Sequence, residues 1–351
     1  MSYTNGLDKP SDYFNTKLYT GNGSTGHAIT GVGHQPDLTW IKSRDNTEWH
    51  ILIDSVRGVT KYINSNDTGV ERTSSNFIES FDSNGFTLGP SNDTNQNSIN
   101  YASWNWKAGT SFTNDASATG IGTIDSTGSV NQDAGFSIVS YTGTGSNATV
   151  GHGLGVAPNV VICKSRTAAQ GWESYFSALG ATQTIRLDST AAAQSASNRW
   201  NNTAPTSTVF SLGTEVAVNG SSANLIAYCF AEKKGYSKFG SYTGNGSTNG
   251  TFVYTGFKSA WVMIKRSSAS GTSWEIRDNK RQPFPDGNAK RLFADDASAE
   301  SSNNEAIEKL SNGFKIRSTG GGHNTSGATY IYMAFAENPF VTSTGVPSTA
   351  K

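Results

Sequence analysis

Three pairs of tryptophan and glutamate are the recurrent residues of this sequence that could do chemistry. The pairs are Glu48-Trp49, Trp172-Glu173 and Trp274-Glu275. An indole ring gives a sugar ring a face on which to stack, and a neighbouring carboxylate accepts hydrogen bonds from sugar hydroxyls. One hypothesis is therefore a carbohydrate site that occurs three times. The alternative, which we favour, is that each tryptophan anchors a strand in a core while the glutamate points outwards.

No other group of residues matches a familiar catalytic or metal-binding motif. The sequence has no G-x-S-x-G elbow, H-E-x-x-H motif, Walker loop or cysteine–histidine pair with a family signature. Its five histidines do not recur at equivalent positions, as a shared metal site would require. We therefore predict no catalytic residues, no metal site and no cofactor. A carboxylate pair for glycoside cleavage is assembled in space, so a glycan depolymerase stays open as an alternative.

The tryptophan–glutamate pairs belong to three copies of one repeat. Each copy begins with a Y-T-G-x-G-S turn, at Tyr19, Tyr141 and Tyr242. A lysine that closes an apolar strand follows each tyrosine by 23 residues, at Lys42, Lys164 and Lys265. Equal spacing in three places indicates a common ancestor for the copies. The glycines suit turns, and because no helix follows them they do not form a phosphate-binding loop.

Each copy ends on an aromatic-rich strand, at residues 101–106, 226–230 and 331–335. Large and small residues alternate along these strands, which predicts one face on a core and the other against something smaller or wetter. The predicted fold is all-β, with three tandem antiparallel β-sandwich modules of the jelly-roll or lectin-like kind, joined in a row. A single elongated barrel, or a trimer interlocked through its linker, are the alternatives.

The repeats divide the chain into six predicted segments. They are an N-terminal arm (1–13), module 1 (14–108), a Gly/Ser/Thr-rich linker (109–134), module 2 (135–234), module 3 (235–340) and a polar C-terminal tail (341–351). The linker has little to bury, so we expect it to be extended or mobile. Modules 2 and 3 are almost fused, whereas module 1 is expected to stand apart, which suggests that anchoring and presentation are divided between them.

Composition narrows the possible partners. The 351 residues include 27 Lys and Arg and 27 Asp and Glu, so there is no basic excess for nucleic acid. Neither a signal peptide nor a membrane-spanning segment is expected, because the longest apolar stretches are strand-sized. Cys163 aligns with Ile41 and Ile264, and Cys229 aligns with Asn105 and Ala334. We expect both to be unreactive and not to form a disulfide, as in a protein assembled in a reducing cytoplasm.

The runs YFNTKLYTGNGSTGHAITGVGHQPDLTWIKSR, FDSNGF and YASWNWKAG resemble a tandem-repeat family of virion structural, tail-fibre-like proteins of marine bacteriophages. The runs AGFSIVSYTGTGS, YTGFKSAWVMIKRS and YIYMAFAENPF extend the resemblance over nearly the whole chain. It implies a protein located in the virion, assembled in the host cytoplasm and bound to other virion proteins. It also implies self-association, with a trimer favoured, and supplies no catalytic residues.

Three functions follow as hypotheses. The leading one is a non-enzymatic virion protein, a tail fibre or tail-associated receptor-binding protein that binds a host-surface glycan. The second is a capsid decoration or head fibre protein. The third is the glycan depolymerase, which the chain favours least because it shows none of the short repeat periods of a β-helix.

Overall fold

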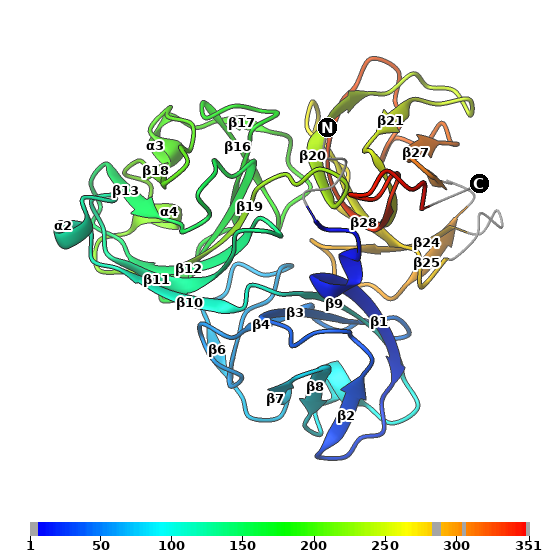
Figure 1. Ribbon diagram of the computed structural model, residues 1–351, viewed down its shortest axis with the longest axis horizontal. Coiled ribbons are helices and arrows are strands. Elements are labelled where there is room, and N and C mark those ends of the chain that lie inside the picture. Colours follow the sequence, from blue (N-terminus) through cyan, green and yellow to red (C-terminus); the bar gives the residue numbers. More distant parts are fainter. Residues whose placement is uncertain (1–5, 283–288, 304–306, 349–351) are drawn as a thin grey trace.

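The computed structural model describes residues 6–282, 289–303 and 307–348 of the chain. The chain is nearly all β-strand, and neighbouring strands in the sheets run antiparallel, which confirms the predicted all-β fold (Figure 1). The short helical turns are Pro10–Asp12, α1 (Asn92–Asn95), α2 (Ala116–Thr119), α3 (Ser197–Trp200) and α4 (Val216–Asn219). Residues 1–5 of the predicted arm and 349–351 of the predicted tail lie outside the described residues.

Lobe 1, residues 14–106, pairs a four-stranded sheet with a three-stranded sheet. The larger sheet has the order β1 (Phe14–Thr20), β9 (Asn100–Trp106), β3 (Leu38–Ser43) and β4 (Ile51–Asp54). The smaller has the order β2 (His27–Thr30), β8 (Gly85–Leu88) and β7 (Ile78–Asp82), and β5 (Lys61–Tyr62) pairs with β6 (Arg72–Thr73). Ile41, Phe86 and Leu88 are buried in one cluster between the two sheets, which gives the lobe its β-sandwich character.

Lobe 2, residues 110–230, has an eight-stranded and a two-stranded sheet. The larger has the order β10 (Thr110–Asn114), β11 (Ser126–Asn131), β12 (Phe136–Thr142), β19 (Asn224–Phe230), β14 (Val160–Ser165), β15 (Glu173–Phe176), β16 (Gln183–Arg186) and β17 (Gln194–Ser195). The smaller pairs β13 (Ala148–Gly151) with β18 (Val209–Leu212). A second buried cluster, which includes Val150 and Leu212, fills this lobe.

Lobe 3, residues 237–339, repeats the plan with a six-stranded and a three-stranded sheet. The larger has the order β20 (Ser237–Thr243), β28 (Thr329–Pro339), β22 (Phe257–Arg266), β23 (Glu275–Asp278), β24 (Ala289–Phe293) and β25 (Ser301–Asn303). The smaller has the order β21 (Phe252–Tyr254), β27 (Gly313–Ile316) and β26 (Ile307–Leu310). Its own cluster includes Val253 and Phe314.

The central strands of the large sheets are buried on both faces. Along β19, Leu225, Ala227 and Cys229 point into the core of lobe 2, whereas Tyr228 and Phe230 point into a central core. Alternate residues of the strand therefore face two different cores. The prediction that one face of the strand would be wetter is wrong. A sheet between two cores needs apolar residues on both faces, which is why these strands read as nearly continuous apolar runs.

The three lobes surround a common centre. Their large sheets correspond residue by residue, because Leu38 pairs with Trp106, Val160 with Phe230, and Trp261 with Phe335. The three paired rings meet in the middle of the molecule: their centroids are 6.3 Å apart for Trp106 and Phe230, 5.7 Å for Trp106 and Phe335, and 5.9 Å for Phe230 and Phe335. The lobes are thus arranged about a pseudo-threefold axis (Figure 1).

This arrangement corrects two predictions. The repeats are not joined in a row, and module 1 does not stand apart from a fused pair. One central cluster contains buried side chains of all three lobes, among them Trp104, Trp172 and Trp261. The length of a linker does not determine which surfaces pack, because burial of apolar area between distant segments decides that instead.

The predicted linker, residues 109–134, is part of lobe 2. It contains α2 and the strands β10 and β11, and β11 pairs with β12 along its whole length. The counterparts of β12 in lobes 1 and 3 are β1 and β20, and both of these strands lie at the edge of their sheet. The segment is ordered because β12 offers unpaired backbone groups and because Ile124 and Val130 reach the core of lobe 2.

Candidate functional site

Two of the three predicted tryptophans lie between lobes and have no exposed surface. The indole N–H of Trp172, in lobe 2, donates to the backbone carbonyl of Asn64 in lobe 1 at 2.8 Å. That of Trp274, in lobe 3, donates to the carbonyl of Arg186 in lobe 2 at 2.8 Å. A buried ring cannot stack on a sugar, so the carbohydrate hypothesis is wrong for Trp172 and Trp274, and the alternative of a core anchor is right.

The counterpart of these tryptophans in lobe 1 is His50 rather than Trp49. Sheet pairing places Ile51, Glu173 and Glu275 at the same position, opposite Ile41, Cys163 and Ile264. The preceding residue in lobe 1 is His50. Alignment by residue type alone had therefore shifted lobe 1 by one position.

His50 completes the ring of contacts between lobes. Its Nδ1 accepts from the Trp40 indole N–H at 2.8 Å, and its Nε2 lies 3.2 Å from the carbonyl oxygen of Asp296 in lobe 3. Burial, and then the charge of Lys42, lower the pKa of His50 well below its usual value. The imidazole is therefore neutral, and its Nε2 carries the proton that Asp296 accepts. His50 of lobe 1 thus bonds to lobe 3, Trp172 of lobe 2 bonds to lobe 1, and Trp274 of lobe 3 bonds to lobe 2.

The glutamates that follow are buried as well. Oε2 of Glu173 accepts from the hydroxyl of Thr184 at 2.8 Å and lies 3.1 Å from Nε of Arg199. Glu275 forms an ion pair with Arg277 and is 3% exposed, as is Glu173. Both the sugar-bonding role and the outward orientation predicted for Glu173 and Glu275 are therefore wrong, because each carboxylate already faces an arginine inside its lobe.

Trp49 and Glu48 keep the exposure that a binding surface needs. The chain has eight tryptophans; seven are buried, and Trp49 is 43% exposed. The guanidinium of Arg72 lies 5.7 Å from the centroid of its ring. Partial burial, and then a hydrogen bond with Asp93, raise the pKa of the half-buried Glu48. We call Glu48, Trp49, Arg72 and Asp93 the Trp49 surface, and it is what remains of the predicted sites.

The recurrent lysines are buried cations, which the sequence did not reveal. Lys42, Lys164 and Lys265 have no exposed surface, and burial lowers the pKa of each to about 8. Nζ of Lys164 donates to the carbonyls of Gln170 at 2.6 Å and of Thr68, in lobe 1, at 2.9 Å. An ammonium held by backbone carbonyls fixes loop geometry, so the role of these lysines is structural.

A buried asparagine explains each Y-T-G-x-G-S turn, and it was also missed. Oδ1 of Asn219 accepts from the backbone N–H of Thr144 at 2.8 Å, while Nδ2 donates to the carbonyls of Ser146 and Gly213 at 2.6 and 2.7 Å. Asn95 and Asn324 make the same set of bonds in the other lobes. Each asparagine lies six residues before the residue that pairs with the tyrosine of the turn, at Tyr101, Leu225 and Tyr330. A finer alignment of the sequence would have found this regular spacing.

Two of the three lobe interfaces carry matching ion-pair networks. Between lobes 1 and 2, Glu71 lies 2.7 Å from Arg166 and 3.4 Å from Arg57, and Arg57 lies 2.6 Å from Asp54. Between lobes 3 and 1 the network consists of Glu300, Arg44, Arg281 and Asp278. Among the described residues, the third interface has the uncharged side chains of Ala193, Ser267, Leu179 and Phe176 at the equivalent positions. These charges therefore belong to lobe packing, not to a site open to solvent.

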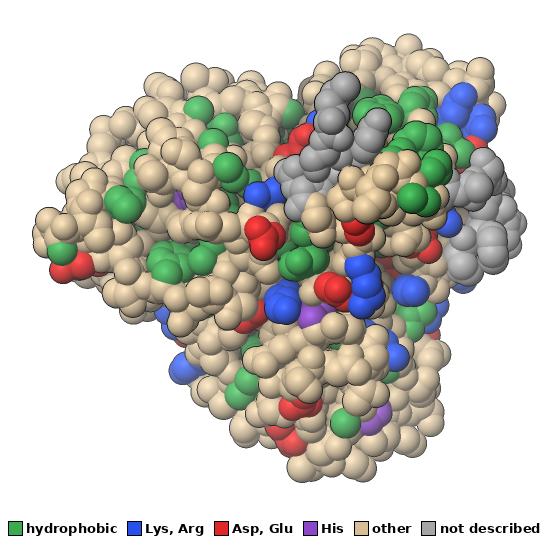
Figure 2. All heavy atoms as spheres, viewed as in Figure 1, with side chains coloured by type: hydrophobic (Ala, Val, Ile, Leu, Met, Phe, Trp, Pro, Cys, Tyr) green, Lys and Arg blue, Asp and Glu red, His purple; other side chains and the backbone are tan. Residues whose placement is uncertain are grey.

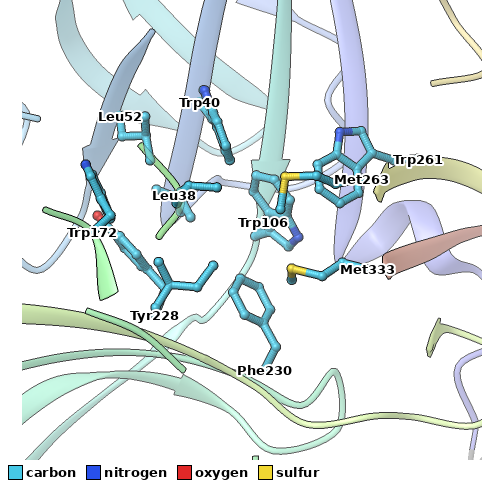
Figure 3. Close-up of a pocket in the computed structure, with 12 residues that line it drawn as sticks. Leu38, Trp40, Leu52, Trp106, Trp172, Tyr228, Phe230, Trp261, Met263 and Met333 are labelled. Carbon is cyan, nitrogen blue, oxygen red and sulfur yellow. The ribbon is translucent and has the colours of Figure 1, made fainter. Parts of the chain in front are cut away.

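A cavity of about 20 Å³ lies at the centre of the molecule. Its lining is apolar and aromatic, and Trp40, Tyr228 and Met333 point into it from three different lobes (Figure 3). This volume is about that of one water molecule, and the lining offers almost no hydrogen-bond partner. The cavity is therefore a gap between large side chains at the pseudo-threefold axis and not a ligand site.

Comparison with protein families gives a match over most of the chain. The match is to a domain of unknown function, DUF7483, and it covers residues 9–339. The chain belongs to this family. No curated protein matches the chain. Because one DUF7483 domain spans all three lobes, the family boundaries agree with a single body around one core.

Other chemistry is sparse in the described part of this DUF7483 chain. There, no helix is long and apolar enough to cross a membrane, and no three His, Cys, Asp or Glu side chains meet as metal ligands would. Cys163 and Cys229 are both free and buried. Burial raises the pKa of Cys163 to about 12, so its thiol is protonated at neutral pH.

Proposed function

We propose that this chain is a non-enzymatic structural protein of a bacteriophage particle, a tail fibre or tail-associated protein that binds a glycan on the host surface. The sequence resemblance to virion proteins motivates the location. The geometry supports a structural role, because a threefold body with one shared core gives a rigid platform for surface loops.

The observation that carries the proposal is the fate of the recurrent residues. A triplicated catalytic or sugar site would place its recurrent polar groups at the surface, where substrate can reach them. Here the recurrent lysines and asparagines are buried. So are His50 and the two pairs Trp172-Glu173 and Trp274-Glu275. The recurrent residues therefore belong to the scaffold. We infer that surface features that differ between the lobes bind the ligand.

The surface fits this division. Figure 2 shows many charged side chains gathered near the junction of the lobes, whereas the outer parts of the lobes are mostly uncharged in this view. Uncharged polar loops bind without strong dependence on ionic strength, since salt screens mainly charge pairs. This property suits contact with a glycan in saline water.

Electron cryomicroscopy of intact particles tests the proposal. We expect density for the threefold body at the tail in a small number of copies, and we expect purified protein to block adsorption of the particle to host cells. Absence of the protein from purified particles would contradict the proposal.

A head decoration protein is the second candidate, and one observation favours it. The chain has a pseudo-threefold axis of its own, and icosahedral shells present local threefold positions onto which such a body could dock. Copies bound to the shell in the same density map would support this candidate and overturn the tail assignment.

A further inference from the structure

A groove on lobe 2 is built largely by the segment that has no counterpart in the other lobes. The groove has a volume of about 430 Å³ and is lined by residues of β10 and β11 together with residues 151–155 and 207–208. This volume lies within the range of about 300–1,000 Å³ typical of small-ligand sites. The extra strands therefore add a concave surface to a scaffold that is otherwise repeated.

Phe112 forms a fixed aromatic wall of this groove. It is half-buried on β10, with its ring against two glycines. A Cβ atom at Gly128 would come within 2.7 Å of the ring, and one at Gly153 within 3.4 Å. The absence of side chains at both glycines makes room for the ring to lie against the backbone. Ile121, 37% exposed, adds a second apolar patch to the lining.

The polar part of the lining is pre-arranged and uncharged. Nδ2 of Asn114 donates to the carbonyl of Ile121 at 2.9 Å, and its Oδ1 accepts from the hydroxyl of Thr119 at 2.8 Å. The exposed Gln132 lines the groove and is held by a 2.8 Å bond from its Nε2 to the carbonyl of Gly153, and its Oε1 is a further acceptor group. Hydroxyls and backbone groups of Thr113, Ser207 and Thr208 complete the lining.

We propose that this groove binds a neutral carbohydrate chain, a statement that rests on the proposed glycan-binding function. The lining contains no Asp, Glu, Lys, Arg or His. A phosphate, sulfate or carboxylate would therefore lose its water without gaining a counter-charge. A neutral sugar presents an apolar C–H face to an aromatic ring and hydroxyls to amides and hydroxyls, which is the combination that the groove offers.

Titration of the full-length chain with oligosaccharides tests this inference. The neutral probes are maltohexaose, cellohexaose, laminarihexaose and fully N-acetylated chitohexaose, and the acidic probe is an alginate hexasaccharide. Ligand-observed NMR and calorimetry measure binding. We expect at least one neutral probe to bind and Phe112→Ala to weaken that binding about tenfold. Gln132→Ala, an exposed position that leaves the core untouched, should weaken it as well.

Phe252→Ala is the matched control, because Phe252 is 41% exposed on β21 of lobe 3, outside the groove. It should leave the affinity unchanged. The inference is overturned if no neutral probe binds, if the acidic probe binds in the groove more tightly, or if Phe112→Ala and Gln132→Ala bind as the wild type does. A protein that still blocks particle adsorption with Phe112 replaced would retain the proposed function while losing this site.

Discussion

At the scale of single residues, two tryptophans of similar sequence context have opposite surroundings. Trp172 fills the interface between lobes 1 and 2, whereas Trp49 lies on the surface beneath Arg72. The sequence shows both beside a glutamate. Only the sheet pairing shows that His50, not Trp49, shares the position of Trp172.

Alanine substitutions separate the two roles. Trp172→Ala should lower the free energy of unfolding by about 3–5 kcal/mol, because it leaves a cavity and leaves the Asn64 carbonyl without its donor. Trp49→Ala should cost about 1 kcal/mol or less, since it removes an exposed ring and one cation–π contact. Urea unfolding of both variants measures the difference. Equal losses would show that our distinction between interface and surface is wrong.

The buried lysines predict a pH dependence of stability. Burial lowers the pKa of Lys164 from 10.5 to about 8 in the folded protein. Between these two values the unfolded chain binds more protons than the folded one, so rising pH stabilises the folded state, and below pH 8 the cost of burying the charge is fully present. Relative to Lys164→Met, the wild type should gain about 1–2 kcal/mol between pH 7 and 9.5.

Urea titrations of both proteins at the two pH values give this difference. Buried cysteine and tyrosine groups, which act in the opposite direction at high pH, are common to both proteins and cancel. If the difference in free energy of unfolding between wild type and variant stayed constant with pH, the burial of a charged Lys164 would be contradicted.

At the scale of elements, the Y-T-G-x-G-S turns depend on the asparagine beneath them. In lobe 3, Nδ2 of Asn324 faces the carbonyl oxygens of Ser247 and Ser318 at 2.7 and 2.6 Å. Asn324→Asp replaces this donor by an oxygen of the same size, so repulsion replaces two hydrogen bonds. We expect a loss of about 2–4 kcal/mol in the free energy of unfolding.

The control for this prediction is Asn147→Asp, at an exposed position of lobe 2. It should change stability by about 0.5 kcal/mol or less. Thermal unfolding of the two variants suffices for the comparison. If Asn324→Asp were as stable as the control, the turn would not depend on the asparagine.

The elements also show how far the sequence could predict the structure. The constant spacing from tyrosine to lysine located β3, β14 and β22, and the aromatic runs located β9, β19 and β28. Residues 109–134 were misread because pairing with β12 is made by backbone groups, which leave little trace in side-chain patterns. The lobe 1 pair was misaligned because Glu48-Trp49 lies just before the position that sheet pairing assigns to His50 and Ile51, so residue type alone selects the wrong residue.

At the scale of the whole molecule, the lobe interfaces are not equivalent. Glu71 joins Arg166 of lobe 2 to Arg57 of lobe 1, with 12% of its side chain exposed. The threefold counterpart in lobe 2 is Ala193, since both residues donate a backbone N–H across their interface. The sequence could not show these relations, because the partners are about a hundred residues apart and no repeat spacing reports which copies touch.

Glu71→Gln tests this interface. It removes the charge that Arg57 and Arg166 share, and we expect a loss of about 1–3 kcal/mol, between the values for exposed and buried ion pairs. The loss should shrink in high salt because Arg166 is partly exposed. Asp133→Asn, at an exposed position, is the control for a change of net charge alone. Equal stability of the two variants would show that the charge of Glu71 does not stabilise the interface between lobes 1 and 2.

The central claim is that three repeats share one core and act as one rigid body. Differential scanning calorimetry of the full chain tests it most directly. We predict a single transition whose van't Hoff enthalpy equals the calorimetric enthalpy, about 250 kcal/mol near 60 °C for a chain of this length. Two or three separate transitions, each with a fraction of that enthalpy, would contradict the shared core and show that the lobes unfold independently.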